Sequence, residues 1–227
     1  MGYRHINNLY KDQTVLMFKR LYAMEKIHGT SAHLSFKFNS DENTGIPYNT
    51  VTYFSGGEKH ENFVNIFNQE DLLEKANNLQ FNHDFTVYGE AYGGSCQKMS
   101  KVYGPAIKFV AFEVEIDKVR LNVPDAEAVV KSLGLEFVSY TLLENFTVEM
   151  LDAEMKKDSV QAIRNGMGPG HLREGIVLRP LIELKMNNGD YIKAKHKNPE
   201  FQETATPRKI DADKVQVIAD AEKAAAE

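Results

Sequence analysis

Five short stretches of this chain carry residue types that could perform chemistry. The first is Glu25-Lys26-Ile27-His28-Gly29, in which a lysine lies between a carboxylate and a turn. The others, in chain order, contain Glu90, Phe112, Arg173-Glu174-Gly175 and Lys193-Ala194-Lys195. Each stretch alone has an ordinary structural explanation, because most lysines and glutamates are solvated surface charges. The hypothesis to test is that Lys26 is a nucleophile on which the later acidic and basic residues converge.

The lysine pair near the end of the chain supports this hypothesis. Lys193 and Lys195 are two residues apart on an expected strand, so they should point to the same side of a sheet. A lysine nucleophile must be neutral, whereas an ordinary lysine amine has a pKa near 10.4. Neighbouring cations favour the neutral amine, and the same cations can neutralise charge that develops on a phosphate. Lys193 and Lys195 are therefore expected to activate the nucleophile.

The sequence pattern predicts strands interrupted by helices and joined by hairpin-length turns. Alternating apolar residues and turn signals indicate strands within 25–38 (two strands around Gly29-Thr30), 50–54, 85–92, 106–116, 175–178 and 191–195. Helical spacing and capping residues indicate helices over 70–79, 124–133, 147–163 and 209–227, with a short helix before the first strand. This order favours an α+β fold with antiparallel sheets over regular βαβ alternation.

Composition narrows the class of protein. The chain has 227 residues, a net charge of −5 and a single cysteine, Cys96. The negative charge argues against a protein coated with positive charge for non-specific nucleic-acid binding, although it leaves room for a local basic groove. No apolar run approaches the roughly 18 to 20 residues that span a bilayer, so no membrane partner is expected. One cysteine excludes an internal disulfide, so a reducing cytoplasmic setting is expected.

Taken together and in this order, the five stretches resemble the covalent nucleotidyltransferase superfamily of ATP-dependent polynucleotide ligases and RNA-capping enzymes. DNA ligases and capping enzymes usually have aspartate as the third residue of the lysine motif. Lys26-Ile27-His28-Gly29 instead resembles the RNA ligase family typified by the second RNA ligase of T-even phages and the trypanosome RNA-editing ligases. The strings from Arg173 to Pro180 and from Ile192 to Lys195 are similar to the same family.

The resemblance implies an ATP-grasp-like nucleotidyltransferase domain that carries out RNA repair in three steps. Lys26 would form lysyl-AMP with ATP, AMP would move to an RNA 5′-phosphate, and a 3′-hydroxyl would then displace AMP. The implied cofactors are ATP and Mg²⁺, with Mn²⁺ as an alternative. The implied partner is RNA with 5′-phosphate and 3′-hydroxyl ends, and the family default is a monomer. The phage-like resemblance places the protein in the cytoplasm, which would be the host cytoplasm if a phage encodes it.

The resemblance also assigns roles to single residues. Phe112 matches the aromatic residue that stacks on adenine, Glu90 matches the ribose contact, and Glu25 lies where relatives contact the edge of the base. Ile27 and Arg179 are further expected nucleotide contacts. His28 is expected to assist a step after adenylylation; alternatively, it only braces the turn.

The metal partner is inferred from the chemistry of carboxylates. Mg²⁺ prefers oxygen ligands and is held by few protein carboxylates. Glu174 is therefore the first candidate metal ligand, and it is also an expected nucleotide contact; Glu90 is the second metal candidate. The chain has neither of the common glycine-rich phosphate loops, G-x-G-x-x-G or G-x-x-x-x-G-K-[ST], so side chains from strand ends would have to bind the nucleotide.

Two departures from the family pattern stand out. Relatives carry an arginine on the strand after the first hairpin, whereas this chain has Tyr53-Phe54-Ser55-Gly56-Gly57 there, so Lys59 or Arg179 would have to substitute. Relatives also have a further C-terminal domain. We expect residues 1–208 to form the adenylyltransferase domain, and 209–227 to form a C-terminal helix, a possible linker to an absent domain.

Three alternatives remain open on the sequence alone. A DNA ligase or a GTP-using capping enzyme would use the same lysine chemistry, but His28 and the lack of room for an OB-fold disfavour both. A nucleotide- or RNA-binding module that has lost catalysis would belong to a different class. Covalent labelling of the protein with ATP or GTP tests these alternatives.

Overall fold

The computed structural model describes residues 2–201, and these residues form two compact units. The first unit comprises residues up to Arg4, Ile27–Val138 and Gln161–Gly168. The second unit comprises His5–Lys26, Ser139–Val160 and the chain from Pro169 onward. The chain therefore passes from the second unit to the first directly after Lys26. The expected helix over 209–227 lies outside the described residues.

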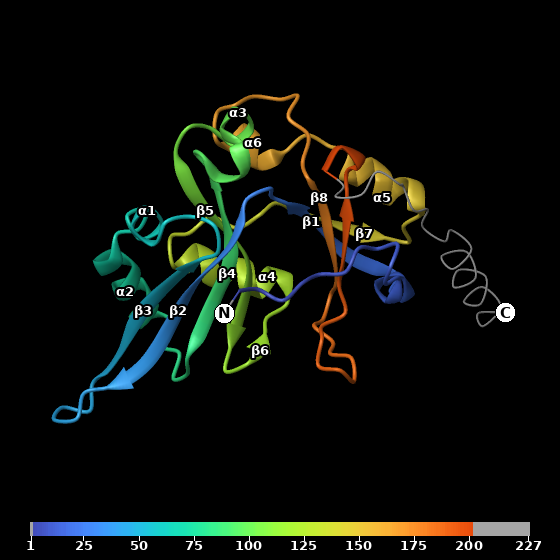
Figure 1. The fold of residues 1–227 in the computed structure, drawn as a ribbon. Coiled ribbons are helices and arrows are strands. Elements are labelled where there is room, and N and C mark those ends of the chain that lie inside the picture. The colour runs from blue at the N-terminus through green and yellow to red at the C-terminus, as the bar shows by residue number, and fades with distance from the viewer. Residues whose placement is uncertain (1, 202–227) are drawn as a thin grey trace. The chain divides into compact units, whose positions relative to one another are not determined.

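The second unit is built on a four-stranded antiparallel sheet in the order β7-β1-β8-β9. Its strands are β1 (Arg20–Lys26), β7 (Tyr140–Glu144), β8 (Gly175–Pro180) and β9 (Ala194–Lys197) (Figure 1). Apolar side chains from β1 and β8 pack with those of α5 (Val148–Met155) and η1 (Thr14–Met17) in one buried cluster that includes Leu21, Ile176 and Leu151. This core fixes the strand ends that carry Lys26 and Glu174.

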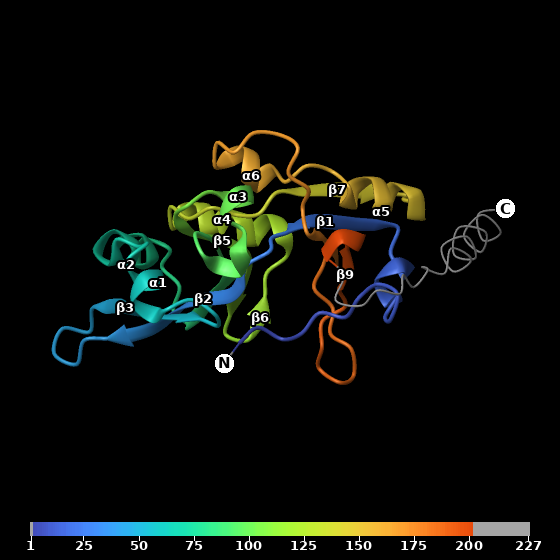
Figure 2. The ribbon, with the colours of Figure 1, turned by 45° about the horizontal axis from the view of Figure 1, so that its top comes forward.

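The first unit is built on a five-stranded antiparallel sheet in the order β3-β2-β4-β5-β6. Its strands are β2 (Thr30–Ser40), β3 (Pro47–Ser55), β4 (Phe85–Gly93), β5 (Ile107–Ile116) and β6 (Val119–Arg120). Strands β2 and β3 form a long hairpin that both views show (Figures 1 and 2). One sheet face is apolar and buried, with Leu34, Phe36 and Val87 at 0–1% exposure.

Helices and short 3₁₀ turns complete the described chain. They are α1 (His60–Val64), α2 (Gln69–Asn78), η2 (Cys96–Lys98), α3 (Ser100–Tyr103), α4 (Val123–Ser132), α6 (Val160–Arg164) and η3 (Pro199–Phe201). Asparagine side chains cap α2 and α4, since Asn68 and Asn122 each accept a hydrogen bond from the backbone three residues on. Of the residues described, no helix is both long and apolar enough to cross a membrane.

The structure confirms the expected α+β class but corrects two elements. The helix predicted over 147–163 is two helices, α5 and α6, and the segment between them pairs with residues that precede β8. The strand predicted at 191–195 is shifted, because β9 begins at Ala194 and ends at Lys197. The second correction changes which lysines lie side by side on the strand.

Candidate active site

Lys26 is the last residue of β1, and its side chain meets the start of β8. Its backbone pairs with Gly175, and its Nζ lies 2.8 Å from Oε2 of Glu174. The Lys26 side chain is 23% exposed, whereas that of Glu174 is 4% exposed. A partly accessible amine is thus held against a buried carboxylate, which is an arrangement that fixes the position of the amine.

The second oxygen of Glu174 contacts another lysine. Oε1 of Glu174 lies 3.0 Å from Nζ of Lys197, whose side chain is 8% exposed. The Glu174 backbone carbonyl also accepts a hydrogen bond of 2.8 Å from the Asn198 amide. A buried carboxylate is costly unless charged and hydrogen-bonded partners compensate it. Here one carboxylate bridges two ammonium groups.

Gly175 allows this cluster to form. Its backbone pairs with Lys26 on one side and with Lys197 on the other. A Cβ atom at this position would lie 2.2 Å from the His196 carbonyl oxygen and 2.8 Å from Cα of Lys197. Only glycine therefore lets β9 approach β8 closely enough to bring Lys197 to Glu174.

The same-face lysine pair of β9 is Lys195 and Lys197, not Lys193 and Lys195 as the sequence predicted. Alternation along the strand puts Lys195 and Lys197 on one side and His196 on the other, where its Nε2 lies 2.7 Å from Asp152. Lys193 precedes β9, with its Nζ 5.9 Å from the centre of the Tyr191 ring. Lys197 is therefore the site residue that the sequence reasoning missed.

Glu25 is buried and engaged within the second unit. Its carboxylate accepts hydrogen bonds from the Ser139 hydroxyl (2.8 Å), the Ser159 hydroxyl (2.5 Å) and the Val160 backbone amide (3.1 Å). These donors come from two segments far from Glu25 in the sequence. They hold the β1 residue that precedes Lys26, which is a structural role that the sequence did not indicate; the expected base contact stays a prediction.

The remainder of the lysine motif belongs to the first unit. The Ile27 side chain is buried, and the His28 backbone amide donates to the Tyr103 hydroxyl at 3.3 Å. A Cβ atom at Gly29 would lie 2.3 Å from the Ala91 carbonyl oxygen and 2.8 Å from Cγ of Glu90. The glycine of the motif is thus required because the chain passes tightly against the end of β4.

Glu90 and Phe112 lie on neighbouring strands of the first unit. Glu90 on β4 pairs with Ser31 on one side and with Val110 on the other. The β4–β5 ladder shifts register at this point, since Tyr88 pairs with Glu113 but Gly89 pairs with Ala111. Phe112 is therefore the extra residue of a β-bulge, a feature that redirects a side chain. Its ring is half-buried and neighbours the ring of Tyr3.

The strand expected to carry the family arginine has an aromatic pair instead. The rings of His33 and Phe54 are stacked, with centres 4.8 Å apart and planes at 18°. Burial lowers the pKa of His33 below its ordinary value, because the uncharged ring is favoured away from water. Lys59, one proposed substitute, is the residue that precedes α1.

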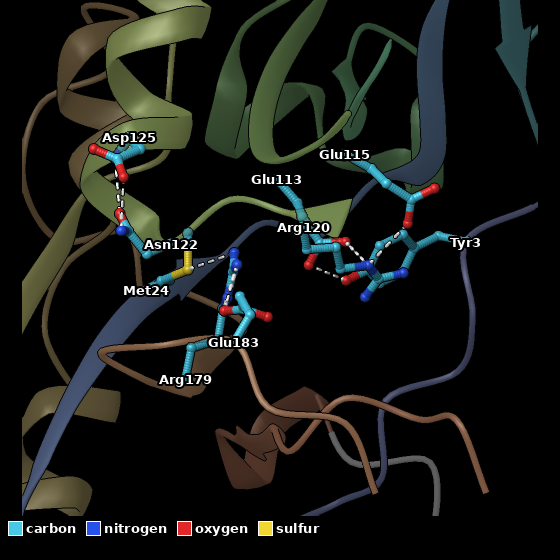
Figure 3. Close-up of polar contacts among 9 residues, drawn as sticks. All are labelled: Tyr3, Met24, Glu113, Glu115, Arg120, Asn122, Asp125, Arg179 and Glu183. Carbon is cyan, nitrogen blue, oxygen red and sulfur yellow. Dashed lines mark hydrogen bonds and ion pairs between the residues drawn. The ribbon is translucent and has the colours of Figure 1, made fainter. Parts of the chain in front are cut away.

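Arg179, the other proposed substitute, forms an internal ion pair in the second unit. Its Nη2 and Nε lie 2.7 and 3.0 Å from Oε1 of Glu183, and Nη1 contacts Sδ of Met24 at 3.7 Å (Figure 3). The Arg179 side chain is 2% exposed. These contacts favour a structural role, and nucleotide binding by Arg179 stays a prediction.

The structure therefore brings together part of the predicted site in each unit. The second unit gathers Lys26, Glu174 and the unpredicted Lys197, with Lys195 on the same strand face as Lys197. The first unit holds Ile27, His28, Glu90 and Phe112. Within residues 2–201, no three or more histidine, cysteine, aspartate or glutamate side chains gather as a metal site.

Comparisons with known proteins bear on the family and the fold of the chain. A family model described as RNA ligase matches residues 19–195. Among solved structures, a Naegleria gruberi RNA ligase mutant with ATP and Mn matches with a TM-score of 0.60 and 16% identity, over 88% of this chain and 57% of that chain. An archaeal ATP-dependent RNA ligase matches with a TM-score of 0.53 and 17% identity, over 88% of this chain and 49% of that chain.

These structural likenesses, at such low identity, show a shared fold. The chain spans 57% and 49% of the lengths of these two solved proteins. A comparison with curated proteins returned no match.

Proposed function

The chain belongs to the RNA ligase family, and from that premise we propose that it is an ATP-dependent RNA ligase that works through lysyl-AMP at Lys26. The single observation that supports this proposal most strongly is the cluster of Lys26, Glu174 and Lys197, with distances of 2.8 and 3.0 Å to the two carboxylate oxygens. A nucleophile, a buried carboxylate and a second cation are the parts that phosphoryl transfer requires.

The proposed reaction consists of three successive displacements at phosphorus. The neutral Nζ of Lys26 attacks the α-phosphorus of ATP; a P–N bond forms, the P–O bond to the β-phosphate breaks, and pyrophosphate leaves with the electron pair. An oxygen of the RNA 5′-phosphate then attacks the same phosphorus, and the Lys26 amine is released. Finally, a 3′-hydroxyl attacks the activated 5′-phosphate, a phosphodiester forms, and AMP leaves.

The lysines of β9 provide the electrostatic part of the first step. Lys197 lies at Glu174, and Lys195 shares its strand face, so both place positive charge near the Lys26 end of the sheet. This positive charge stabilises negative charge that builds on the phosphate oxygens during displacement.

The residues present fit a divalent cation as a partner of the nucleotide. Glu174 has two carboxylate oxygens, which contact Lys26 and Lys197 in the structure and could turn to a metal when Lys26 moves to the nucleotide. Mg²⁺ is commonly held by one or two carboxylates together with substrate phosphates and water. We assign Glu174 as the first protein ligand and Glu90 as the second candidate. When bound, Mg²⁺ or Mn²⁺ would neutralise charge on the phosphate oxygens. The Naegleria relative was solved with ATP and Mn.

The remaining assignments follow the family resemblance. Phe112 stacks on adenine, Glu90 contacts the ribose, and His28 assists a step after adenylylation; Ile27, Glu25 and Arg179 are kept as further nucleotide contacts. The proposed partner is RNA with 5′-phosphate and 3′-hydroxyl ends, and the proposed state is a cytoplasmic monomer with residues 1–208 as the adenylyltransferase domain.

Covalent labelling tests the proposal directly. The protein is incubated with ATP labelled at the α-phosphate and Mg²⁺, denatured, and examined for retained label. Wild type should retain AMP, and Lys26→Ala should retain none. The matched control is Lys37→Ala, because Lys37 is a 65% exposed lysine that pairs with Asp84 in the first unit. An unlabelled wild type would contradict the enzyme assignment.

Two further arms separate the alternatives. Label from GTP but not from ATP would indicate a capping enzyme. Sealing of nicked duplexes that differ only in the sugar beside the nick separates RNA ligation from DNA ligation, and we expect the ribose nick to be preferred.

Glu174→Ala tests the assigned carboxylate. We expect folding to be retained while adenylylation falls by about 100-fold or more, since removal of one electrostatic element of a preorganised site has effects of this order. Circular dichroism and the labelling assay measure the two properties. Normal labelling of Glu174→Ala would show that the metal assignment is wrong.

A further inference from the structure

A second cluster lies beside Phe112 in the first unit and is not used by the proposed chemistry. The Tyr3 hydroxyl donates a 2.8 Å hydrogen bond to Oε2 of Glu113, and Nε of Arg120 lies 3.0 Å from Oε1 of the same carboxylate (Figure 3). Nε of Arg120 also lies 3.3 Å from Glu115. Glu113 is fully buried, and the Arg120 side chain is 7% exposed. A buried network of this kind, with hydrogen-bonded and ion-paired members, restrains its side chains more than a surface ion pair does.

The Tyr3 ring is the element that links this network to Phe112. The ring centre lies 5.3 Å from the Arg120 guanidinium and 5.3 Å from the centre of the Tyr88 ring. On another side it meets the Phe112 ring in an edge-to-face arrangement, with centres 5.0 Å apart and planes at 81°. The Tyr3 backbone amide also donates to the Ser31 hydroxyl at 3.3 Å. Tyr3 is therefore anchored at both its backbone and its hydroxyl.

The place of Phe112 in the sheet makes the direction of its side chain unusual. It is the extra residue of the β4–β5 bulge, a feature that redirects a side chain. The edge-to-face contact with Tyr3 favours one orientation of the Phe112 ring.

We propose that Tyr3, held by the buried Glu113–Arg120 ion pair, is a positioning residue that orients the Phe112 ring for stacking on the adenine of ATP. The inference rests on the proposed function, in which Phe112 is the base-stacking residue. It adds that Tyr3, which is more than a hundred residues from Phe112 in the sequence, contributes to nucleotide recognition without touching the nucleotide itself.

Kinetics of adenylylation provide the first test. For Tyr3→Ala we expect the KM for ATP to rise by about 3- to 10-fold with kcat nearly unchanged, which is the range that a lost aromatic pair contact corresponds to. Tyr3→Phe keeps the ring and loses the hydroxyl, so its KM should lie closer to that of wild type. Tyr48→Ala is the matched control, because Tyr48 is a 44% exposed tyrosine on β3 of the same unit.

A spectroscopic test separates positioning from general stability. The chain contains no tryptophan, so Phe112→Trp introduces a single fluorescent ring at the position of interest. Its fluorescence should be quenched by ATP and should show high anisotropy before ATP is added. In the double variant with Tyr3→Ala, the anisotropy should be lower and the quenching at a given ATP concentration weaker than in Phe112→Trp alone. In the double variant with Tyr3→Phe, both should lie close to the values of Phe112→Trp alone.

The outcomes separate failure of the positioning role of Tyr3 from failure of the proposed function. If ATP quenches the tryptophan but Tyr3→Ala changes neither anisotropy nor KM, the positioning role is refuted while the proposed function stands. If ATP does not quench the tryptophan although wild type retains covalent AMP, the stacking role of Phe112 and with it this inference are refuted. If wild type retains no AMP, the proposed function itself fails.

Discussion

The Glu174 carboxylate is buried, and its charge is tolerable only because two lysines oppose it. Lys26 and Lys197 reach its two oxygens from strands on either side of β8. In the structure, Lys26 is thus held in an ion pair that fixes the position of its Nζ. In the proposed reaction, the Lys26 amine must leave Glu174 to attack ATP. Lys197 remains as a partner of Glu174, and the anionic phosphates of the nucleotide offer Lys26 another partner.

Lys193, which precedes β9, and Lys197, which ends it, allow a matched comparison of two candidate lysines. We expect Lys197→Ala to reduce adenylylation by about 100-fold, because it removes a cation from a preorganised site. Lys193→Ala should reduce it by about 5-fold at most, since a cation near a half-exposed tyrosine contributes up to about 1 kcal/mol. The labelling assay under single-turnover conditions measures both. An equal loss of adenylylation in the two variants would support the role of Lys193 that the sequence predicted.

The strands of the two sheets show why some site residues were predictable from the sequence and others were not. Apolar alternation located β2, β4 and β5, and the position of Lys26 at a strand end followed from the adjacent turn. The start of β9 was not predictable from the pattern, because the long connection after β8 sets which lysine reaches Glu174. The serines that hold Glu25 lie more than a hundred residues away, and only folding brings them together.

The bulge at Phe112 shows a second limit of predicting side-chain directions from the alternation of residues along a strand. A regular strand would put Phe112 and Glu113 on opposite sides of the sheet. The register shift between Tyr88 and Gly89 instead allows both side chains to contact Tyr3. A shift of one residue leaves the composition of the strand unchanged, so the sequence of β5 does not reveal it.

Substitution of Gly175 tests how closely β9 packs against β8. We expect Gly175→Ala to lower the free energy of unfolding by about 1 to 3 kcal/mol, the cost of forcing extra atoms into a packed region. The new Cβ would meet the His196 carbonyl oxygen at 2.2 Å, so β9 must move away from β8. Urea denaturation measures the stability, and labelling should fall as Lys197 leaves Glu174.

Gly2→Ala is the control for that variant, because a Cβ there meets nothing within 4 Å. It should leave both properties unchanged. An unaltered urea midpoint in Gly175→Ala would mean that the two strands are less tightly constrained than the structure indicates.

Each unit of the whole molecule has its own sheet and its own buried core, and the lysine motif crosses from one unit to the other. Lys26 ends a stretch of the second unit, and Ile27, His28 and Gly29 begin the first. The short lysine motif therefore contacts both sheets: Lys26 pairs with Gly175 of β8, and Gly29 lies against the end of β4. The family and fold class were predictable because ordered motifs and strand patterns lie in the sequence itself. Contacts such as Glu25 with Ser159, or Arg179 with Met24, join segments that only tertiary packing brings together.

Two buried weak acids of the first unit make the stability of the molecule depend on alkaline pH. Burial raises the pKa of the Tyr92 hydroxyl to about 12 and that of the Cys96 thiol to about 11. The unfolded chain releases these protons at lower pH, near 10.0 for tyrosine and 9.0 for cysteine. The stability that the protonated groups contribute is therefore complete below about pH 9 and is lost as the pH rises through the folded-state values.

We accordingly expect the urea midpoint of the wild type to fall as the pH rises from about 9 to about 12. Cys96→Ala and Tyr92→Phe should each make that fall shallower, because each removes one group that titrates differently in the folded and unfolded states. Tyr92→Phe also loses the 2.8 Å hydrogen bond from Gln161, so its midpoint at pH 7 should be lower than that of wild type. Identical pH profiles in all three proteins would show that neither group titrates differently on folding.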